Sequence, residues 1–281
     1  MLHIIVENEK GDSLELTNNP AFDVLEVVGT NPPVAAINTV VVSGFDGSRF
    51  NSSRVEQRNI VITLNLQHPI ERNRLILYQF FSVKKWVRIR YKTATRDVFC
   101  DGYVESFENN PFTQLQQPQI SIICPNPFWQ ADADTVVNFT GSTALFEFPF
   151  SIPSDGIPFS TVLIEGQQIV NVGEIETGAI ITFSALGNVK NPQFNNLTTG
   201  EYFGVDVQLY NGDSVILDTI QGEKSVRKVS SGSSTNILSA RTAGSKWLQF
   251  QAGENLLSYS AEEGSANLRC VLTLRRKYEG V

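Results

Sequence analysis

The chain has 281 residues, of which 41% are hydrophobic and 18% are charged. This composition supports buried cores and excludes a chain that is disordered throughout. The formal net charge of −7 disfavours general nucleic-acid binding, because phosphate contacts need clustered cations.

The length favours two domains over one. Three scattered cysteines, Cys100, Cys124 and Cys270, lie in apolar strand contexts, which is typical of buried thiols in a reducing cytoplasm. The N-terminus meets acidic residues early and has no apolar core region, so we expect no secretory signal. No apolar run reaches membrane-spanning length, so we also expect no membrane insertion.

The first half predicts a β domain with one helix and an extended arm. An opening strand is expected at residues 2–6. Residues 29–53 are rich in Gly, Pro, Asn and Ser and suit a long hairpin or arm, with a strand-like run at 39–42. Pro69 and the apolar spacing after it predict a helix at about 69–82. Apolar alternation predicts further strands at residues 60–66, 86–91, 97–106 and 119–124.

The cationic residues gather in one part of the first half, at Lys84, Lys85, Arg88, Arg90, Lys92 and Arg96. On a strand, Arg88 and Arg90 share one face. A solvated face, or one paired with a neighbouring subunit, is favoured over a phosphate site.

Between two of these strands lies a polar, Gln-rich segment, residues 109–118, that carries Phe112 and Leu115. Two interpretations stay open. The segment is either a hairpin tip that contacts a partner or a loop folded back on its own domain.

Two prolines at residues 125 and 127 cannot lie inside a central strand, so a domain boundary is expected near residue 130. We therefore assign residues 1–130 and 131–281 to separate domains. The second domain predicts a two-sheet sandwich or jelly roll, with Asn211, Gly212 and Asp213 forming a hairpin turn. Its strands are expected at residues 143–150, 160–166, 179–185, 204–210, 214–219, 224–229, 246–251 and 267–276.

The residues that carry chemistry do not converge in the sequence. Two distant histidines, His3 and His68, cannot supply a metal site, and no G-x-S-x-G nucleophile motif occurs. Asp132 and Asp134 start like a calcium loop, but Val136 stands where a third oxygen ligand is needed. The acid pairs at 174/176 and 213/218 suit strand edges and turns better than a glycosidase site. The sequence predicts no enzyme, no metal and no cofactor.

Short runs along both halves resemble the distal tail proteins of long-tailed bacteriophages that infect Gram-positive bacteria. Their order over nearly the whole chain carries the resemblance. The runs are SGFDG (43–47), RNIVI (58–62), HPIE (68–71), GYVE (102–105), CPNPFW (124–129), NVGEIET (171–177), NLTTG (196–200), DT (218–219) and AGEN (252–255).

The resemblance implies a mainly β fold, with a barrel-like, ring-forming N-terminal domain and a galectin-like C-terminal sandwich. It implies a homohexameric ring, single or stacked, at the tail tip of the virion, assembled in the host cytoplasm. The implied partners are the tail tube protein, the tape-measure protein, tail lysins and receptor-binding proteins. DNA passes through such a ring without sequence-specific binding.

We expect subunit or partner contacts among the exposed apolar and cationic residues of the first half. An alternative function is adhesion to host carbohydrate through the C-terminal sandwich, with Trp247 and Tyr202 as sugar contacts. No gap between the strands is long enough for an inserted carbohydrate-binding module. The candidate contact residues are Phe45, Phe50, Arg54, Arg88, Arg90, Phe112 and Leu115.

Overall fold

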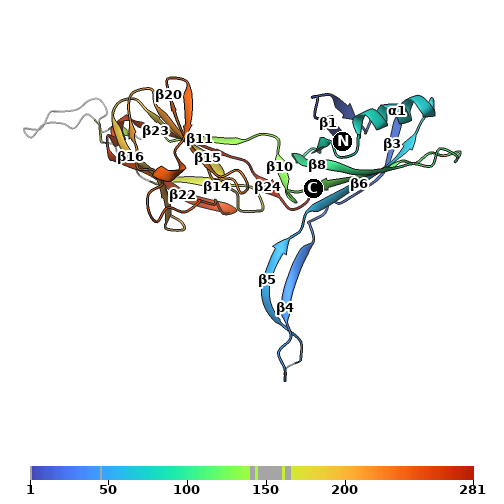
Figure 1. Cartoon of the computed structure of the whole chain (residues 1–281), viewed down its shortest axis with the longest axis horizontal. Helices are drawn as coiled ribbons and strands as arrows, with labels where there is room; N and C mark the ends of the chain where they lie inside the picture. The colour runs from blue at the N-terminus through green and yellow to red at the C-terminus, as the bar shows by residue number, and fades with distance from the viewer. Residues whose placement is uncertain (1, 45, 140–142, 145–159, 162–165) are drawn as a thin grey trace, which may run out of the picture. The chain divides into compact units, whose positions relative to one another are not determined.

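The computed structural model describes the chain except for residues 1, 45, 140–142, 145–159 and 162–165 (Figure 1). The chain divides into two compact units, residues 1–132 with 277–281, and residues 133–276. The last five residues lie with the first unit, although the sequence assigned them to the second. The reason is that β24 (Lys277–Tyr278) pairs with β10 (Trp129–Ala131).

A nine-stranded antiparallel sheet forms the body of the first unit. Its main path runs β2-β1-β7-β8-β9-β6-β3, while β10 pairs with β8 and with β24. The remaining bounds are β1 (His3–Asn8), β2 (Ser13–Glu15), β3 (Phe22–Val28), β6 (Arg58–Leu66), β7 (Trp86–Lys92), β8 (Asp97–Glu108) and β9 (Gln119–Cys124).

Apolar alternation explains most of these strands. In β6 every second residue is buried, so Ile60, Ile62 and Leu64 point into the core. The helix α1 (Ile70–Phe80) follows Pro69 and buries Leu77 against this core. The predicted helix and a mainly β fold are thereby confirmed.

The sequence analysis missed the edge strand β3. A register shift between Val24 and Glu26 breaks its alternation, and Leu25 is half exposed. A β-bulge therefore hides the two-residue period from which strands are predicted.

A separate two-stranded hairpin leaves the first unit between β3 and β6 (Figure 1). Among the strands that the structure describes, β4 (Ala35–Val40) and β5 (Arg49–Val55) pair only with each other. We call residues 29–55 the arm. The strand expected at residues 39–42 lies earlier in the chain than predicted, at 35–40.

Two larger sheets make up the second unit. One has six strands in the order β11-β23-β15-β19-β20-β21, and the other has the path β14-β22-β16-β17, with β18 paired to β16. The bounds are β11 (Thr135–Phe139), β14 (Gln167–Asn171), β15 (Ala179–Ala185), β16 (Val189–Asn196), β17 (Glu201–Gly204), β18 (Gln208–Leu209), β19 (Ser214–Asp218), β20 (Ser225–Ser230), β21 (Ser233–Asn236), β22 (Gly253–Glu263) and β23 (Leu268–Leu274).

Aromatic side chains from both large sheets meet in one core. Phe139 of β11 packs edge-on against Phe194 of β16, with 5.4 Å between ring centroids, and against Tyr259 of β22. Phe183 of β15 belongs to the same cluster. Because the inward faces of the two sheets share this core, the unit is a sandwich.

Three expectations for the second unit need correction. Residues 246–251 form no strand; only Phe250 makes an isolated bridge, to Thr177. The turn at Asn211 and Gly212 is no hairpin, because β18 and β19 belong to different sheets. The strand expected at 204–210 is interrupted between β17 and β18.

A short pair of strands, β12 (Thr143–Ala144) and β13 (Ser160–Thr161), falls within two other predicted strands. The rest of the strand predicted at 143–150 lies outside the described residues. So does most of the strand predicted at 160–166.

The buried carboxylate of Asp213 gives the second unit a testable pH dependence. A hydrogen bond from Ser230, a backbone bond from Tyr210 and the Lys228 ammonium lower the pKa of Asp213 from 3.8 to about 2. The Lys228 Nζ lies 3.0 Å from its Oδ2.

We expect Asp213→Asn to lower the unfolding free energy of this unit by about 1–2 kcal/mol at neutral pH. Because the folded-state pKa is depressed, the carboxylate's contribution is present above pH 3.8 and is lost as the pH falls toward 2. Urea unfolding at several pH values should therefore show a flatter profile for the variant in that window. Exposed Asp46→Asn is the control, and an unchanged profile in Asp213→Asn would contradict the assignment.

Candidate functional site

No reactive constellation forms among the residues that the structure describes. No group of three or more His, Cys, Asp or Glu side chains in this part of the chain is placed to hold a metal ion. Asp132 pairs with Arg90, and Asp134 pairs with Arg275, so the two acids of the calcium-like run face separate cations. The Nδ1 of His3 lies 2.8 Å from the carboxylate of Glu15, at the surface.

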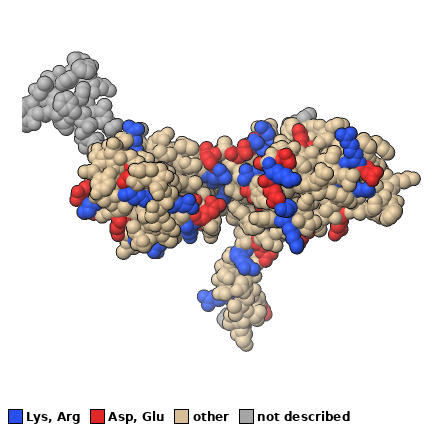
Figure 2. All heavy atoms as spheres, turned by 45° about the horizontal axis from the view of Figure 1, so that its top comes forward, with Lys and Arg blue, Asp and Glu red and all other residues tan. Residues whose placement is uncertain are grey.

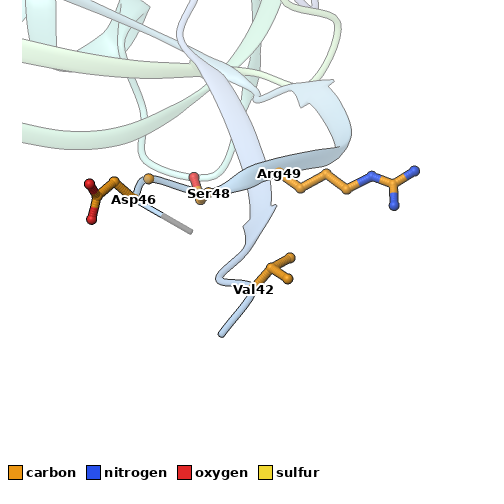
Figure 3. Close-up of a pocket in the computed structure, with 5 residues that line it drawn as sticks. Val42, Asp46, Ser48 and Arg49 are labelled. Atoms are coloured by element: carbon orange, nitrogen blue, oxygen red, sulfur yellow. The ribbon is translucent and has the colours of Figure 1, made fainter. Parts of the chain in front are cut away.

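A hollow of about 320 Å³ lies at the tip of the arm and is lined by Val42, Asp46, Gly47, Ser48 and Arg49. In Figure 3 the Asp46 and Arg49 side chains point in opposite directions, and Val42 lies apart from both. These groups do not converge on a common point. The hollow therefore has no arrangement for catalysis.

The arm exposes apolar side chains along its length. Ile37 is 59% exposed, Phe50 60% and Val41 78%, and every residue of β5 is exposed. An isolated hairpin is only marginally stable in water, and clustered apolar exposure marks contact surfaces. The arm is therefore the clearest candidate interaction surface of the first unit. It carries the predicted contacts Phe50 and Arg54, whereas Phe45 lies outside the described residues.

Acidic neighbours within the first unit neutralise the cationic strand β7. Arg88 makes a two-pronged contact with Asp101, at 2.7 and 3.0 Å. Arg90 binds Asp97 at 2.7 Å through both Nε and Nη2, and its Nη2 also lies 2.8 Å from Asp132. These contacts lower the pKa of Asp97, with the Arg90 hydrogen bond as the largest cause. Blue and red atoms accordingly lie side by side on the face shown in Figure 2.

The loop between β8 and β9 presents two apolar side chains on a pre-organised backbone. Phe112 is 96% exposed and Leu115 68%. The Thr113 hydroxyl donates to the Asn110 and Leu115 carbonyls, at 2.9 and 2.8 Å, and the amide of Phe112 donates to Asn110 Oδ1. A ring held in solvent by an ordered turn loses little conformational entropy when it binds.

The base of the arm is held by a buried cation that the sequence analysis missed. Arg58 is only 3% exposed, and its guanidinium lies 5.5 Å from the centre of the Trp129 ring. It donates to the carbonyl oxygens of Gly29, Asn31, Pro127 and Glu279.

One residue therefore joins the arm root, the end of the first-unit sheet and the C-terminal segment. Burial lowers the pKa of the Arg58 guanidinium from its ordinary value, although an arginine stays charged at any ordinary pH. The sequence did carry one signal for the burial of Arg58: it lies at even spacing from Ile60 and Ile62, so all three side chains of β6 point inward. We call this arrangement the Arg58 clamp.

The two proposed sugar contacts lie in the second unit. Trp247 is partly buried against the core, and its ring centre lies 5.0 Å from that of Phe203. The Lys224 Nζ lies 5.6 Å from the centre of the Trp247 ring. The Tyr202 hydroxyl donates to the Ala243 carbonyl at 2.8 Å. The two side chains thus make separate contacts within the unit.

The described residues include no helix that is long and apolar enough to cross a bilayer. What they present is two β units, an arm with exposed apolar residues and a loop with an exposed aromatic ring. The exposed apolar side chains make the arm and this loop candidate contact surfaces.

Comparison with known proteins finds one family match and several similar structures. Residues 172–278 match the family described as siphovirus-type tail component, C-terminal domain. The match spans most of the second unit, together with residues 277 and 278 of the first. Among curated proteins, no sequence matches the chain.

Solved structures agree in fold. The crystal structure of the Dit protein of phage SPP1, described as a paradigm of the hub adsorption apparatus in phages infecting Gram-positive bacteria, aligns with a TM-score of 0.69. The alignment covers 98% of each chain at 13% identity. Chains of the phage P2 baseplate in its activated conformation, with Ca or Sr, align over 100% of both chains with a TM-score of 0.58 and 11% identity. Together the family match and the fold confirm the resemblance to Dit-type distal tail proteins.

The Arg58 clamp predicts a large loss of stability when the guanidinium is removed. In Arg58→Met four carbonyl oxygens lose the guanidinium donor, so we expect the unfolding free energy to fall by about 3 kcal/mol. Arg58→Lys should lose less unfolding free energy than Arg58→Met but stay below the native chain, since one ammonium cannot reach all four carbonyls. Denaturant unfolding measures both variants. The exposed Arg54→Met is the matched control, and equal midpoints for Arg58→Met and Arg54→Met would refute the clamp.

Proposed function

We propose that this protein is the structural hub of a phage tail tip or baseplate. In this role it forms a homohexameric ring, single or in two stacked copies, that connects the tail tube to the proteins below it. The single observation that carries the proposal is the arm, a hairpin that pairs with no other strand of the described residues and exposes apolar residues on both faces.

The arm needs a partner surface for a physical reason. Fully burying one large apolar side chain stabilises by about 1.5–3 kcal/mol. Ile37, Val41 and Phe50 are mostly exposed in a single copy, so they gain little of this free energy there. An arm that projects from one body and packs on the next makes a head-to-tail contact. Such contacts close into rings when the rotation between copies allows it.

The loop that carries Phe112 and Leu115 supplies a second contact in this proposal. Aromatic residues, phenylalanine included, are enriched at the cores of protein interfaces. We assign this loop to a neighbouring tail protein or subunit. Arg88 and Arg90 are paired with acids of their own chain. We therefore expect them to modulate the affinity of such a contact and not to supply most of it.

The remaining partners follow from the place of a hub in a tail. They are the tail tube protein, the tape-measure protein, and the tail lysins or receptor-binding proteins, with assembly in the host cytoplasm. The net charge of −7 suits a conduit through which DNA must pass without being held.

The assembly state tests the proposal directly. A hexamer of the 31.1 kDa chain has a mass of roughly 190 kDa. We expect mass photometry to find this species and negative-stain images to show rings with a central hole. Monomers alone at high concentration, both with and without the purified tail tube protein, would rule the ring out.

Arm variants should separate assembly from folding. In Ile37→Ser/Phe50→Ser we expect self-association to weaken at least about tenfold, because two side chains lose apolar contact across the interface. The melting temperature should change little, since both side chains are largely exposed within one copy. Val136→Ser, an exposed apolar residue of β11, is the matched control. Rings of unchanged stability in the arm variant would show that the arm does not join the subunits.

A further inference from the structure

The outer face of the β16-β17-β22 sheet carries a polar groove of about 310 Å³. Its walls come from β16, β17, β22 and the segments around Asp206 and Thr242. The lining side chains include amides, hydroxyls and carboxylates, from Asn191, Gln193, Asp206, Thr242, Ser260 and Glu262. This volume lies at the lower end of the range for small-molecule sites.

A glycine forms part of the groove wall. Gly204 lies opposite Gln193 in the strand register, and an added Cβ would come within 2.9 Å of Thr242 Oγ1. The loop after Ala240 is held against it, because the amide of Gly204 donates to Ser245 Oγ at 3.0 Å and its carbonyl accepts from the amide of Thr242. A larger residue at position 204 would crowd the groove, so the backbone keeps it open.

Hydrogen bonds within the wall fix the polar groups in place. The Thr242 hydroxyl donates to Asp206 Oδ1 at 2.5 Å, and the Asn191 amide donates to Glu262 Oε2 at 2.6 Å. The Gln193 amide donates to Asn195 Oδ1 at 2.6 Å. Each of these acids and amides keeps further lone pairs or N–H groups for a ligand.

The charges of the groove select against anions. Asp206 and Glu262 bring two carboxylates, while Lys190 lies 2.6 Å from Glu262 and offsets one of them. A phosphate or uronate would meet net negative charge. Interleaved donors and acceptors instead match the vicinal hydroxyl groups of a neutral sugar, which both donate and accept.

We propose that this groove binds a short neutral saccharide. The Asp206 carboxylate and the Gln193 carbonyl would accept from sugar hydroxyls, and the Ser260 hydroxyl and Asn191 amide would complete the contact. This is a binding site on the second unit that differs from the Trp247 and Tyr202 site considered from the sequence, since neither residue lines the groove.

No aromatic side chain lines the groove, so hydrogen bonds alone must hold the ligand. Because sugar hydroxyls exchange water for protein partners with little net gain, we expect a Kd of about 1 mM per site. Several copies on one assembly would raise the apparent affinity for a polysaccharide by 10²-fold or more. That last step rests on the ring proposed above, whereas binding by a single copy does not.

Saturation-transfer NMR on the full chain tests the site with defined probes: glucose, galactose, N-acetylglucosamine, rhamnose and, as the anionic arm, glycerol phosphate. We expect transfer to at least one neutral sugar and none to glycerol phosphate. The signal should fall at least threefold in Asp206→Asn and in Ser260→Ala. Both variants are close in size to the native residues, and their melting curves should match that of the native chain.

Ser233→Ala, which removes an exposed hydroxyl on β21 in the other sheet, is the matched control and should leave the signal unchanged. The proposal is overturned if no neutral sugar gives transfer at 20-fold the expected Kd, about 20 mM. It is also overturned if the signal persists in both groove variants or if glycerol phosphate binds in place of the sugars. Ring formation is measured separately by mass photometry, so failure here leaves the hub proposal standing.

Discussion

Desolvation of one guanidinium is the constraint on which the first unit depends. A buried cation without hydrogen bonds would be strongly unfavourable, so Arg58 requires four carbonyl oxygens to come together around it. Those carbonyls belong to the arm root, the boundary segment and the C-terminal residues. The Arg58 clamp thereby fixes where the arm leaves the sheet. Trp129 closes the clamp on one side with a fully buried ring.

A rigid base restricts the orientations of the arm. A hairpin that pairs only with itself gains little stability from its own contacts, but a fixed root limits the directions in which it can reach. In the proposed ring, apolar residues that are exposed in one copy, such as Phe50, would be buried against the next copy and would stabilise the assembly. This division separates folding from association, since the core of the first unit closes without the arm. The same logic applies to Phe112, which is held out by hydrogen bonds of its own loop.

The second unit combines a closed apolar core with a polar outer face. Phenylalanines from both sheets fill the sandwich interior, so the lining of the groove is free to be polar. The family match and the shared fold make the chain similar to Dit-type tail proteins, but a fold does not fix what a surface binds. A sugar-binding groove on a structural hub would place weak, repeated contacts where many copies are displayed together.

The sequence by itself determined the elements with a clean period: β6, β9, β15 and the single α-helix of the described chain. It also indicated the arm, but it left open whether the loop that carries Phe112 is exposed or folded back on its own domain. Only the tertiary structure revealed β14, β16 and β22, because buried Asn171, Asn196 and Asn255 occupy inward positions that the alternation rule reserves for apolar residues. The Asn171 amide donates to the carbonyl of Phe250, 79 residues away, and the Asn196 amide donates to that of Gln249, 53 residues away, so only the folded chain brings these partners together. The Asn255 amide donates to the carbonyl of Gln251, four residues earlier. The Arg58 clamp escaped prediction for the same reason, since its partners lie 27 to 221 residues away along the chain.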